Sequence, residues 1–124
     1  MIRVVVTGVA GRMGQRLAAL TIEGEGLELV GGVEAPGHEA VGSPLSALVS
    51  GGEAAGDVVD DLEMVIGGAD VVIAFTAPAA TVEHAAVCAR HGSAMVVGTT
   101  GMSADQLAEF NRAVKPIACV FAPN

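Results

Sequence analysis

The chain has 124 residues, which fits one domain of ordinary size. Hydrophobic residues make up 52% of the chain and charged residues 16%, a composition that can fill a core and is not typical of disorder. The formal net charge of −8 and the absence of Trp and Tyr argue against a nucleic-acid partner. No apolar stretch approaches the roughly 18 to 20 residues of a membrane span, and the chain opens directly on a strand-like run. We therefore expect no membrane segment, no signal peptide and a cytoplasmic location.

Taken in chain order, strands and helices are predicted to alternate. Ile2–Thr7 is rich in β-branched residues, as expected of a strand that is covered on both faces. A helix begins near Arg12, with Met13, Leu17 and Leu20 at helical spacing along its inward face. Further strands are predicted at 27–33, 57–59, 69–75, 93–98 and 117–121, a long surface loop at 35–56, short helices at 45–49 and 62–66, and longer helices at 78–91 and 104–115.

Local signals mark the ends of the two later helices. Pro78 suits the first helical position, where its missing N–H costs nothing, and Gly92 can close the same helix. Ser103 and Gln106 have the spacing of a capping box, which predicts the start of the last helix.

The alternation as a whole predicts the fold class. It indicates a single α/β domain with a doubly wound, Rossmann-like parallel sheet whose first strand lies near the centre. In such a sheet, ligands bind at the carboxyl ends of the strands. Binding residues are therefore expected in the loops at 8–14, 76–78 and 98–101, and in the segments that begin at Glu34 and Ala122.

Three glycines connect the first strand to the first helix. Gly8 ends the strand in a turn that favours a residue without Cβ, Gly11 allows a close approach to the backbone, and Gly14 allows close packing of the helix. The free N–H groups and positive dipole end of the helix would then face the crevice, as a pyrophosphate site requires. Because Ala10 stands at the usual second glycine, the pattern is G-x-x-G-x-x-G, and a packing turn without a ligand is the alternative.

Glu34 supports the ligand interpretation of this turn. It follows the second strand, 20 residues after Gly14, where a carboxylate can accept hydrogen bonds from both hydroxyls of an adenine ribose. A solvated loop acid is the alternative. Arg12 has two open interpretations, a contact to the pyrophosphate or adenosine and a plain surface arginine at a helix start.

The remaining reactive residue types form no predicted catalytic or metal-binding cluster. Cys88 and Cys119 lack metal-ligand spacing and are expected to be buried free thiols. His38, His84 and His91 have no partner arrangement, and none has the companions of a nucleophilic triad. We interpret His84 as helix surface and His91 as a residue at a helix C-terminus. No catalytic residue and no metal ligand is therefore predicted in this chain.

Five sequence features at these separations resemble one family. They are "VTGVAGRMG" at 6–14, Glu34, "FTAP" at 75–78, "VVGTTG" at 96–101 and "VFAPN" at 120–124. Together they resemble the N-terminal domain of the 4-hydroxy-tetrahydrodipicolinate reductase family of lysine and diaminopimelate biosynthesis. The resemblance implies an NAD(P)H-dependent oxidoreductase whose cofactor is held by Gly8, Val9, Ala10, Gly11, Arg12 and Met13 at the phosphates, by Glu34 at the adenosine ribose, by Gly98, Thr99 and Thr100 along the nicotinamide, and by Ala122, Pro123 and Asn124 at the nicotinamide end.

The sequence departs from the family pattern at two places. Ala74 stands where the family often has Asp before "FT". Ala35 and Pro36 stand where some members carry an Arg suited to a 2′-phosphate. We therefore expect NAD to be the preferred cofactor, with NADP as a weaker one.

The family's second domain is not found within these 124 residues. In the family it carries a histidine-rich motif, a catalytic acid and a lysine, and it binds a small cyclic dicarboxylate substrate. The resemblance implies a homotetramer for the full-length protein, built largely through that domain. We expect residues 1–124 alone to bind dinucleotide as a monomer or weak dimer, without reductase turnover.

Two other functions stay open on the sequence alone. One is another NAD(P)-dependent oxidoreductase of the same fold, similar to aspartate or homoserine dehydrogenases. The other is a nucleotide-binding module that does no catalysis. The "GTTG" and "APN" motifs weigh against the first, and the second has no recognisable partner surface in its favour.

Overall fold

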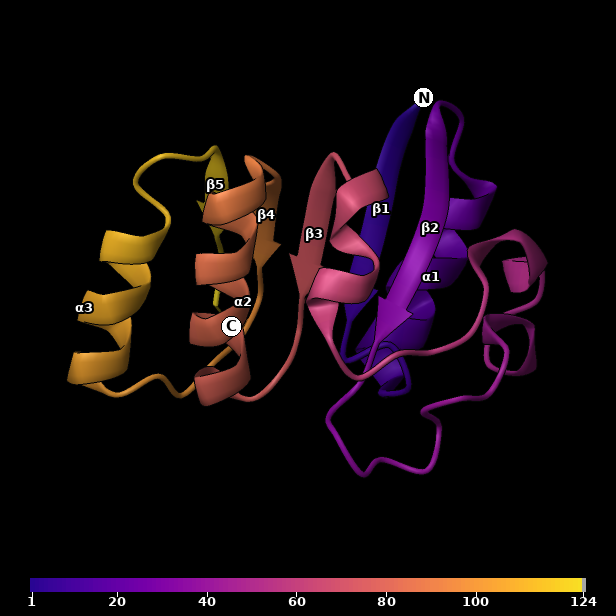
Figure 1. Cartoon of the computed structure of the whole chain (residues 1–124), viewed down its shortest axis with the longest axis horizontal. Helices are drawn as coiled ribbons and strands as arrows, with labels where there is room; N and C mark the ends of the chain where they lie inside the picture. The colour runs from indigo at the N-terminus through magenta and orange to yellow at the C-terminus, as the bar shows by residue number, and fades with distance from the viewer. Residues whose placement is uncertain (124) are drawn as a thin grey trace.

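Five parallel strands form one sheet in the order β2-β1-β3-β4-β5 in the computed structural model, which describes residues 1–123 (Figure 1). The strands are β1 (Ile2–Thr7), β2 (Leu27–Val33), β3 (Val71–Ala74), β4 (Ala94–Val97) and β5 (Cys119–Phe121), and the α-helices are α1 (Arg12–Glu23), α2 (Pro78–His91) and α3 (Ala104–Ala113). Four single 3-10 turns complete the described elements: η1 (Leu45–Ala47), η2 (Gly52–Ala55), η3 (Leu62–Met64) and η4 (Ile66–Gly68). The predicted α/β class and the interior position of β1 are confirmed.

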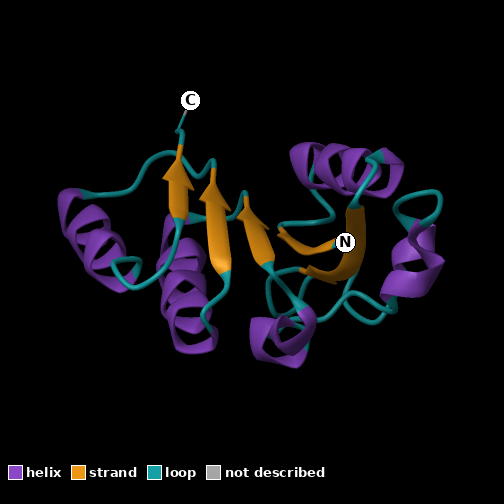
Figure 2. Cartoon of the chain, turned by 90° about the horizontal axis from the view of Figure 1, so that it is seen from above, coloured by secondary structure: helices purple, strands orange, loops and turns teal. Residues whose placement is uncertain are grey.

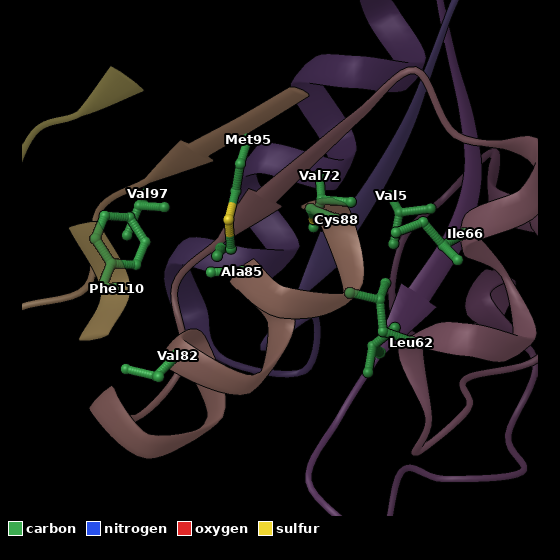
Figure 3. Packing of buried hydrophobic residues seen from close by; sticks show 12 residues of the cluster. Val5, Leu62, Ile66, Val72, Val82, Ala85, Cys88, Met95, Val97 and Phe110 are labelled. Atoms are coloured by element: carbon green, nitrogen blue, oxygen red, sulfur yellow. The ribbon is translucent and has the colours of Figure 1, made fainter. Parts of the chain in front are cut away.

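Helices cover both faces of the sheet. Figure 2 shows α1 on one face, over the β1–β2 half, and α2 and α3 on the other face. The two faces alternate along β1, since Val4 and Val6 belong to the cluster under α1 and Val5 belongs to the opposite cluster. Figure 3 shows that opposite cluster, in which Met95 and Phe110 are among the largest buried side chains. Sequence periodicity and parallel pairing therefore give two separate hydrophobic layers.

The buried stripe of α1 is shifted by one position along the helix from the predicted stripe. Gly14, Ala18 and Thr21 are buried, whereas Met13 is 51% exposed and Leu20 is 46% exposed. The cause is the glycine turn, because Gly14 packs directly on the backbone of Gly8 and a Cβ at Gly14 would overlap that backbone. This contact orients the whole helix, and hydrophobic spacing alone did not predict it.

The predicted strand at 57–59 is also wrong. Asp57 forms an isolated antiparallel bridge with Pro44, and Val59 forms an isolated parallel bridge with Val33. The two bridges run to different partners in opposite directions, so neither ladder extends to a second residue. The helix expected at 45–49 is the 3-10 turn η1, which buries Leu45 completely.

The predicted helix ends are confirmed. Pro78 occupies the start of α2, and Gly92 caps its end with a φ of 69°. Ser103 and Gln106 form both hydrogen bonds of the capping box at the start of α3. None of the helices within residues 1–123 is long and apolar enough to span a membrane.

Both cysteines of the described chain are free thiols. Cys88 is fully buried on α2, and burial raises the pKa of its thiol to about 12. Cys119 on β5 is half-buried, and burial raises its pKa as well. Both thiols therefore stay protonated and unreactive near neutral pH.

Candidate functional site: a cleft at the carboxyl ends of the strands

A cleft of about 480 Å³ opens where β1, β2 and β3 end. The order of the strands reverses between β1 and β3, and parallel sheets bind ligands at such reversal points. The loops that follow these three strands supply most of the lining, together with the first turns of α2. The lining residues are Gly8, Ala10, Gly11, Val33, Glu34, Ala35, Pro36, His38, Asp60, Phe75, Thr76, Ala77, Ala80, Glu83 and His84.

The glycine turn is fixed by backbone hydrogen bonds to β2. The N–H groups of Gly8 and Val9 both donate to the Val33 carbonyl, at 2.8 and 3.2 Å. Gly8 has a φ of 69°, and a Cβ there would lie 2.6 Å from the Phe75 carbonyl oxygen. A residue with a side chain is therefore excluded at Gly8 by conformation and by space.

Gly11 differs from the other two glycines of the turn. A Cβ at Gly11 would meet only the Gly8 oxygen, at 3.4 Å, which is an ordinary contact. Within the described chain, packing therefore does not require glycine at this position. Gly11 also lines the cleft, which agrees with a role in close approach to a ligand.

Glu34 connects the glycine turn to the loop that follows β2. Its Oε2 accepts a hydrogen bond from the Ala10 N–H at 2.9 Å, and its Oε1 accepts one from the Ala35 N–H at 3.0 Å. Each carboxylate oxygen can accept a second hydrogen bond. Glu34 is thus held in one orientation with acceptor capacity left for a ligand in the cleft.

The N-terminus of α1 provides free hydrogen-bond donors beside this carboxylate. Gly11 is the cap residue and supplies no side-chain acceptor. No hydrogen bond from the amides of Arg12, Met13 or Gly14 is found within residues 1–123. Unpaired amides at the positive end of a helix dipole form an anion site. The side chains of Arg12 and Met13 are exposed, and neither residue is part of the cleft lining.

The cleft is lined by acidic groups. Glu34, Asp60 and Glu83 contribute carboxylates, and His38 and His84 contribute imidazoles. No Lys or Arg of residues 1–123 is part of the lining. Such a lining favours hydroxyl groups and disfavours an additional phosphate.

His84 is a half-buried cleft residue, so its interpretation as helix surface is wrong. Its Nδ1 is buried without a hydrogen-bond partner among residues 1–123. Burial lowers the pKa of His84, and the charges of Glu83 and Asp61 offset that effect only in part. His84 points inward because it follows Ala80 by one helical turn on the same face of α2.

The other two histidines also have partners that sequence patterns did not reveal. The Nδ1 of His38 accepts a hydrogen bond from the Ala40 N–H at 3.0 Å, which leaves Nε2 as the proton-bearing nitrogen of the neutral ring. His91 lies in the last turn of α2, as expected, and its Nε2 lies 2.7 Å from Oε2 of Glu63. Arg90 binds the same carboxylate, and the two partners lower the pKa of Glu63.

The "GTT" loop lies beside the cleft and contributes no residue to its lining. Gly98 packs under the ring of Phe75, and a Cβ at Gly98 would overlap that ring. Thr99 is 3% exposed, and its hydroxyl lies 2.6 Å from the hydroxyl of Thr81. Thr100 is exposed.

Ala122 and Pro123, which follow β5, also lie outside the cleft. The Ala122 N–H donates to the Val97 carbonyl at 2.9 Å, which holds this segment beside β4. Ala122 and Pro123 are exposed, and Asn124 lies outside the described residues. Of the residues expected to bind cofactor, the cleft therefore brings together Gly8, Ala10, Gly11 and Glu34. Val9 is instead fully buried in the core under α1.

Several cleft residues were not predicted individually. Phe75, Thr76 and Ala77 belong to the "FTAP" loop, which was expected to face the crevice because it follows a strand. Asp60 follows the isolated bridge residue Val59, and no sequence pattern indicated its position. The residues on α2 could have been found from their one-turn spacing along a helix that starts at the ligand-binding edge.

A comparison with known families tests the family resemblance found in the sequence. A sequence model of the family described as "Dihydrodipicolinate reductase, N-terminus" matches residues 2–124. The chain belongs to this family. The resemblance found from the glycine turn, Glu34 and the "GTTG" and "APN" motifs is confirmed.

Curated relatives carry the same family name. Proteins named 4-hydroxy-tetrahydrodipicolinate reductase from Syntrophobacter fumaroxidans and Desulfotalea psychrophila are 40% and 44% identical over 124 residues. Each match covers 100% of this chain and 46% of the relative. The chain therefore spans about half the length of the curated relatives that it matches.

Solved structures agree with the family and with the fold. A dihydrodipicolinate reductase from Paenisporosarcina sp. TG-14, determined with bound dipicolinate, is 30% identical with a TM-score of 0.72. The match covers 100% of this chain and 48% of that protein. Aspartate semialdehyde dehydrogenase with NADP from Candida albicans reaches a TM-score of 0.73 at 15% identity, a likeness of fold alone.

Proposed function

We propose that this chain is the nicotinamide-dinucleotide-binding part of a reductase that transfers hydride to 4-hydroxy-tetrahydrodipicolinate or its dihydrodipicolinate product. The observation that carries the proposal is the position of Glu34. Its carboxylate is fixed by the Ala10 amide, beside the free amides at the start of α1. An anion site next to an oriented carboxylate fits the pyrophosphate and ribose of a dinucleotide.

The residues of the cleft fit the parts of such a cofactor. The amides of Arg12 and Met13 would hold the pyrophosphate, and the free acceptor positions of Glu34 would hold the ribose hydroxyls. Gly98, Thr99, Thr100, Ala122, Pro123 and Asn124 stay predictions for the nicotinamide end. When bound, the cofactor supplies the hydride, and the protein supplies orientation and a dry surface.

The substrate and the complete reaction are proposed from the relatives. The curated relatives extend to about twice the matched length, since the chain covers 46% of each. We assign substrate binding and protonation to the part of the whole protein that corresponds to the unmatched half of these relatives. The substrate would be a small cyclic dicarboxylate, and the whole protein is proposed to be a homotetramer.

The acidic lining supports a preference for NAD over NADP. Glu34 occupies the ribose position, and Ala35 and Pro36 follow it in the lining with no positive charge. A 2′-phosphate placed there would meet the carboxylate without a basic partner.

Isothermal titration of NADH into the protein tests the proposal. We expect saturable binding that weakens by about 1 to 3 kcal/mol in Glu34→Ala, the scale of lost charge-assisted hydrogen bonds. Glu109→Ala is the matched control, because Glu109 is an exposed acid on α3, away from the cleft. Equal NADH affinity in both variants would contradict the assignment of Glu34.

A further inference from the structure

Three threonine hydroxyls form a chain beside the cleft. Thr76 follows β3, Thr81 lies in the second turn of α2, and Thr99 follows β4. The Oγ1 atoms of Thr76 and Thr81 lie 2.9 Å apart, and those of Thr81 and Thr99 lie 2.6 Å apart. Both distances are typical of O–H···O hydrogen bonds. The chain thus links two loops that follow adjacent strands through one helix.

The environments of the three hydroxyls differ. Thr81 is 0% exposed and Thr99 is 3% exposed. Thr76 is half-buried and lines the cleft. Within residues 1–123, no further hydrogen bond is found from any of the three hydroxyls. Each hydroxyl carries one proton, so the three protons serve two links and one proton remains.

Burial decides which hydroxyl keeps the remaining proton. If Thr81 accepted from both neighbours, its own proton would be buried without an acceptor. If Thr76 donated to Thr81 and Thr81 donated to Thr99, the proton of Thr99 would be buried without an acceptor. A buried unsatisfied donor is unfavourable, so the remaining arrangement is preferred. In that arrangement Thr99 donates to Thr81, Thr81 donates to Thr76, and the proton of Thr76 is free at the cleft.

We propose that this directional chain makes Thr76 a hydrogen-bond donor to an oxygen of the dinucleotide's sugar–phosphate backbone, with Thr81 as the positioning residue. The inference rests on the proposed function for the identity of the ligand. Its physical basis is independent, because the direction follows from the hydroxyl geometry and burial alone. Thr81 contributes no atom to the cleft lining and acts through Thr76. The γ2-methyl of Thr76 lies beside Gly8, so this residue lies next to the glycine turn.

The first test uses the protein without ligand. Proton NMR should detect slowly exchanging hydroxyl protons for Thr81 and Thr99, whereas the hydroxyl proton of Thr76 should exchange with water. A protected Thr76 hydroxyl together with a rapidly exchanging Thr99 hydroxyl would show the opposite direction and would overturn the proposal. This measurement is valid whether or not the protein binds a dinucleotide.

The second test measures coupling in NADH binding. Thr81→Val and Thr76→Val should each weaken binding by about threefold to tenfold, the effect of one hydrogen bond. The double variant should bind no more weakly than Thr76→Val, because Thr81 acts only through that side chain. Losses that multiply in the double variant would show that Thr81 has no positioning role.

Two further variants separate positioning from a general structural effect. Thr81→Ser keeps the hydroxyl and should restore the affinity to within about twofold of the unsubstituted protein. Thr21→Val removes another buried hydroxyl, which donates to the Leu17 carbonyl in α1 at 2.8 Å, and should leave NADH affinity unchanged. An unsubstituted protein that does not bind NADH would refute the proposed function, whereas NADH binding that Thr81→Val leaves unchanged would refute only this inference.

Discussion

The loops after β1 and β2 are held more firmly than the segment after β5. The Val33 carbonyl accepts two amides of the glycine turn, and Glu34 binds the Ala10 amide as well. Of the two described residues after β5, Ala122 donates one backbone hydrogen bond, to the Val97 carbonyl. Both Ala122 and Pro123 are exposed. The phosphate and ribose end of the proposed site is therefore preorganised by this chain, whereas Ala122 and Pro123 are held less firmly. Affinity for a dinucleotide should depend mainly on the first region.

Removing the aromatic core near β5 should separate stability from binding most clearly. Phe110 is 1% exposed and packs against Phe121 with ring centroids 5.3 Å apart. Phe110→Ala should lower the free energy of unfolding by about 3 to 5 kcal/mol, because it leaves a cavity under β4 and β5. Urea denaturation measures this loss. If the regions are independent, NADH affinity of the folded variant stays within about twofold of the unsubstituted protein, and a larger loss would show coupling between them.

A substitution in the glycine turn should instead affect NADH affinity more than it affects the stability of the fold. Gly14→Ala places a Cβ against the backbone of Gly8 and forces α1 away from the turn. We expect about 1 to 3 kcal/mol of destabilisation from this overpacking. NADH binding should weaken by about tenfold or more, since the free amides move with the helix. Calorimetry and urea denaturation together measure both effects.

Gly67→Ala is the control for this substitution. An added Cβ at Gly67 meets no atom within 4 Å, so both stability and NADH affinity should stay nearly unchanged. Unchanged binding in Gly14→Ala would mean that the exact position of α1 does not matter for the ligand.

The choice between cofactors should be a smaller effect. The cleft lining carries three carboxylates, and no Lys or Arg of residues 1–123 is part of it. NADPH should therefore bind a few-fold more weakly than NADH, because Glu34 repels the 2′-phosphate. Parallel titrations of both cofactors measure the ratio, and Glu34→Gln should reduce it. Tighter binding of NADPH by the unsubstituted protein would contradict the proposed preference.

The smallest expected effect concerns pH. Burial lowers the pKa of His84 from its ordinary value of 6.5, so the unfolded chain binds more protons than the folded one in the range between the two values. The stability that neutral His84 contributes is complete above about pH 6.5 and decreases as the pH falls through the folded pKa. Urea midpoints between about pH 7.5 and pH 5 should show this decrease, and His84→Gln should remove part of it. Parallel curves for the two proteins would assign the pH dependence to other groups.

The features that the sequence predicted well depend on local patterns. The glycine turn, the capping box at Ser103 and the cap at Gly92 each require particular residues at short spacing. Glu34 follows from the same kind of pattern, because its place is set by the end of β2. Such features depend on backbone conformation within a few residues and are therefore readable along the chain.

The features that were missed depend on packing between distant segments. The buried stripe of α1 is set by contact between Gly14 and Gly8, and His84 faces the cleft because α2 packs on β4, η3 and η4. The link from Thr81 to Thr99 joins residues 18 positions apart. Hydrophobic spacing does not determine the rotation of a helix about its axis to within one residue. A shift of one residue is enough to change which side chain faces a cleft.

The contact between Gly98 and Phe75 connects the "GTT" loop to one wall of the cleft. Phe75 lines the cleft, and its ring occupies the space that a side chain at Gly98 would need. A larger residue at position 98 would displace the ring, and the open space beside the ring is the cleft. A displaced Phe75 ring would occupy space that the ligand needs, although residue 98 itself does not line the cleft. Glycine at position 98 therefore leaves the Phe75 ring in its place at the wall of the cleft.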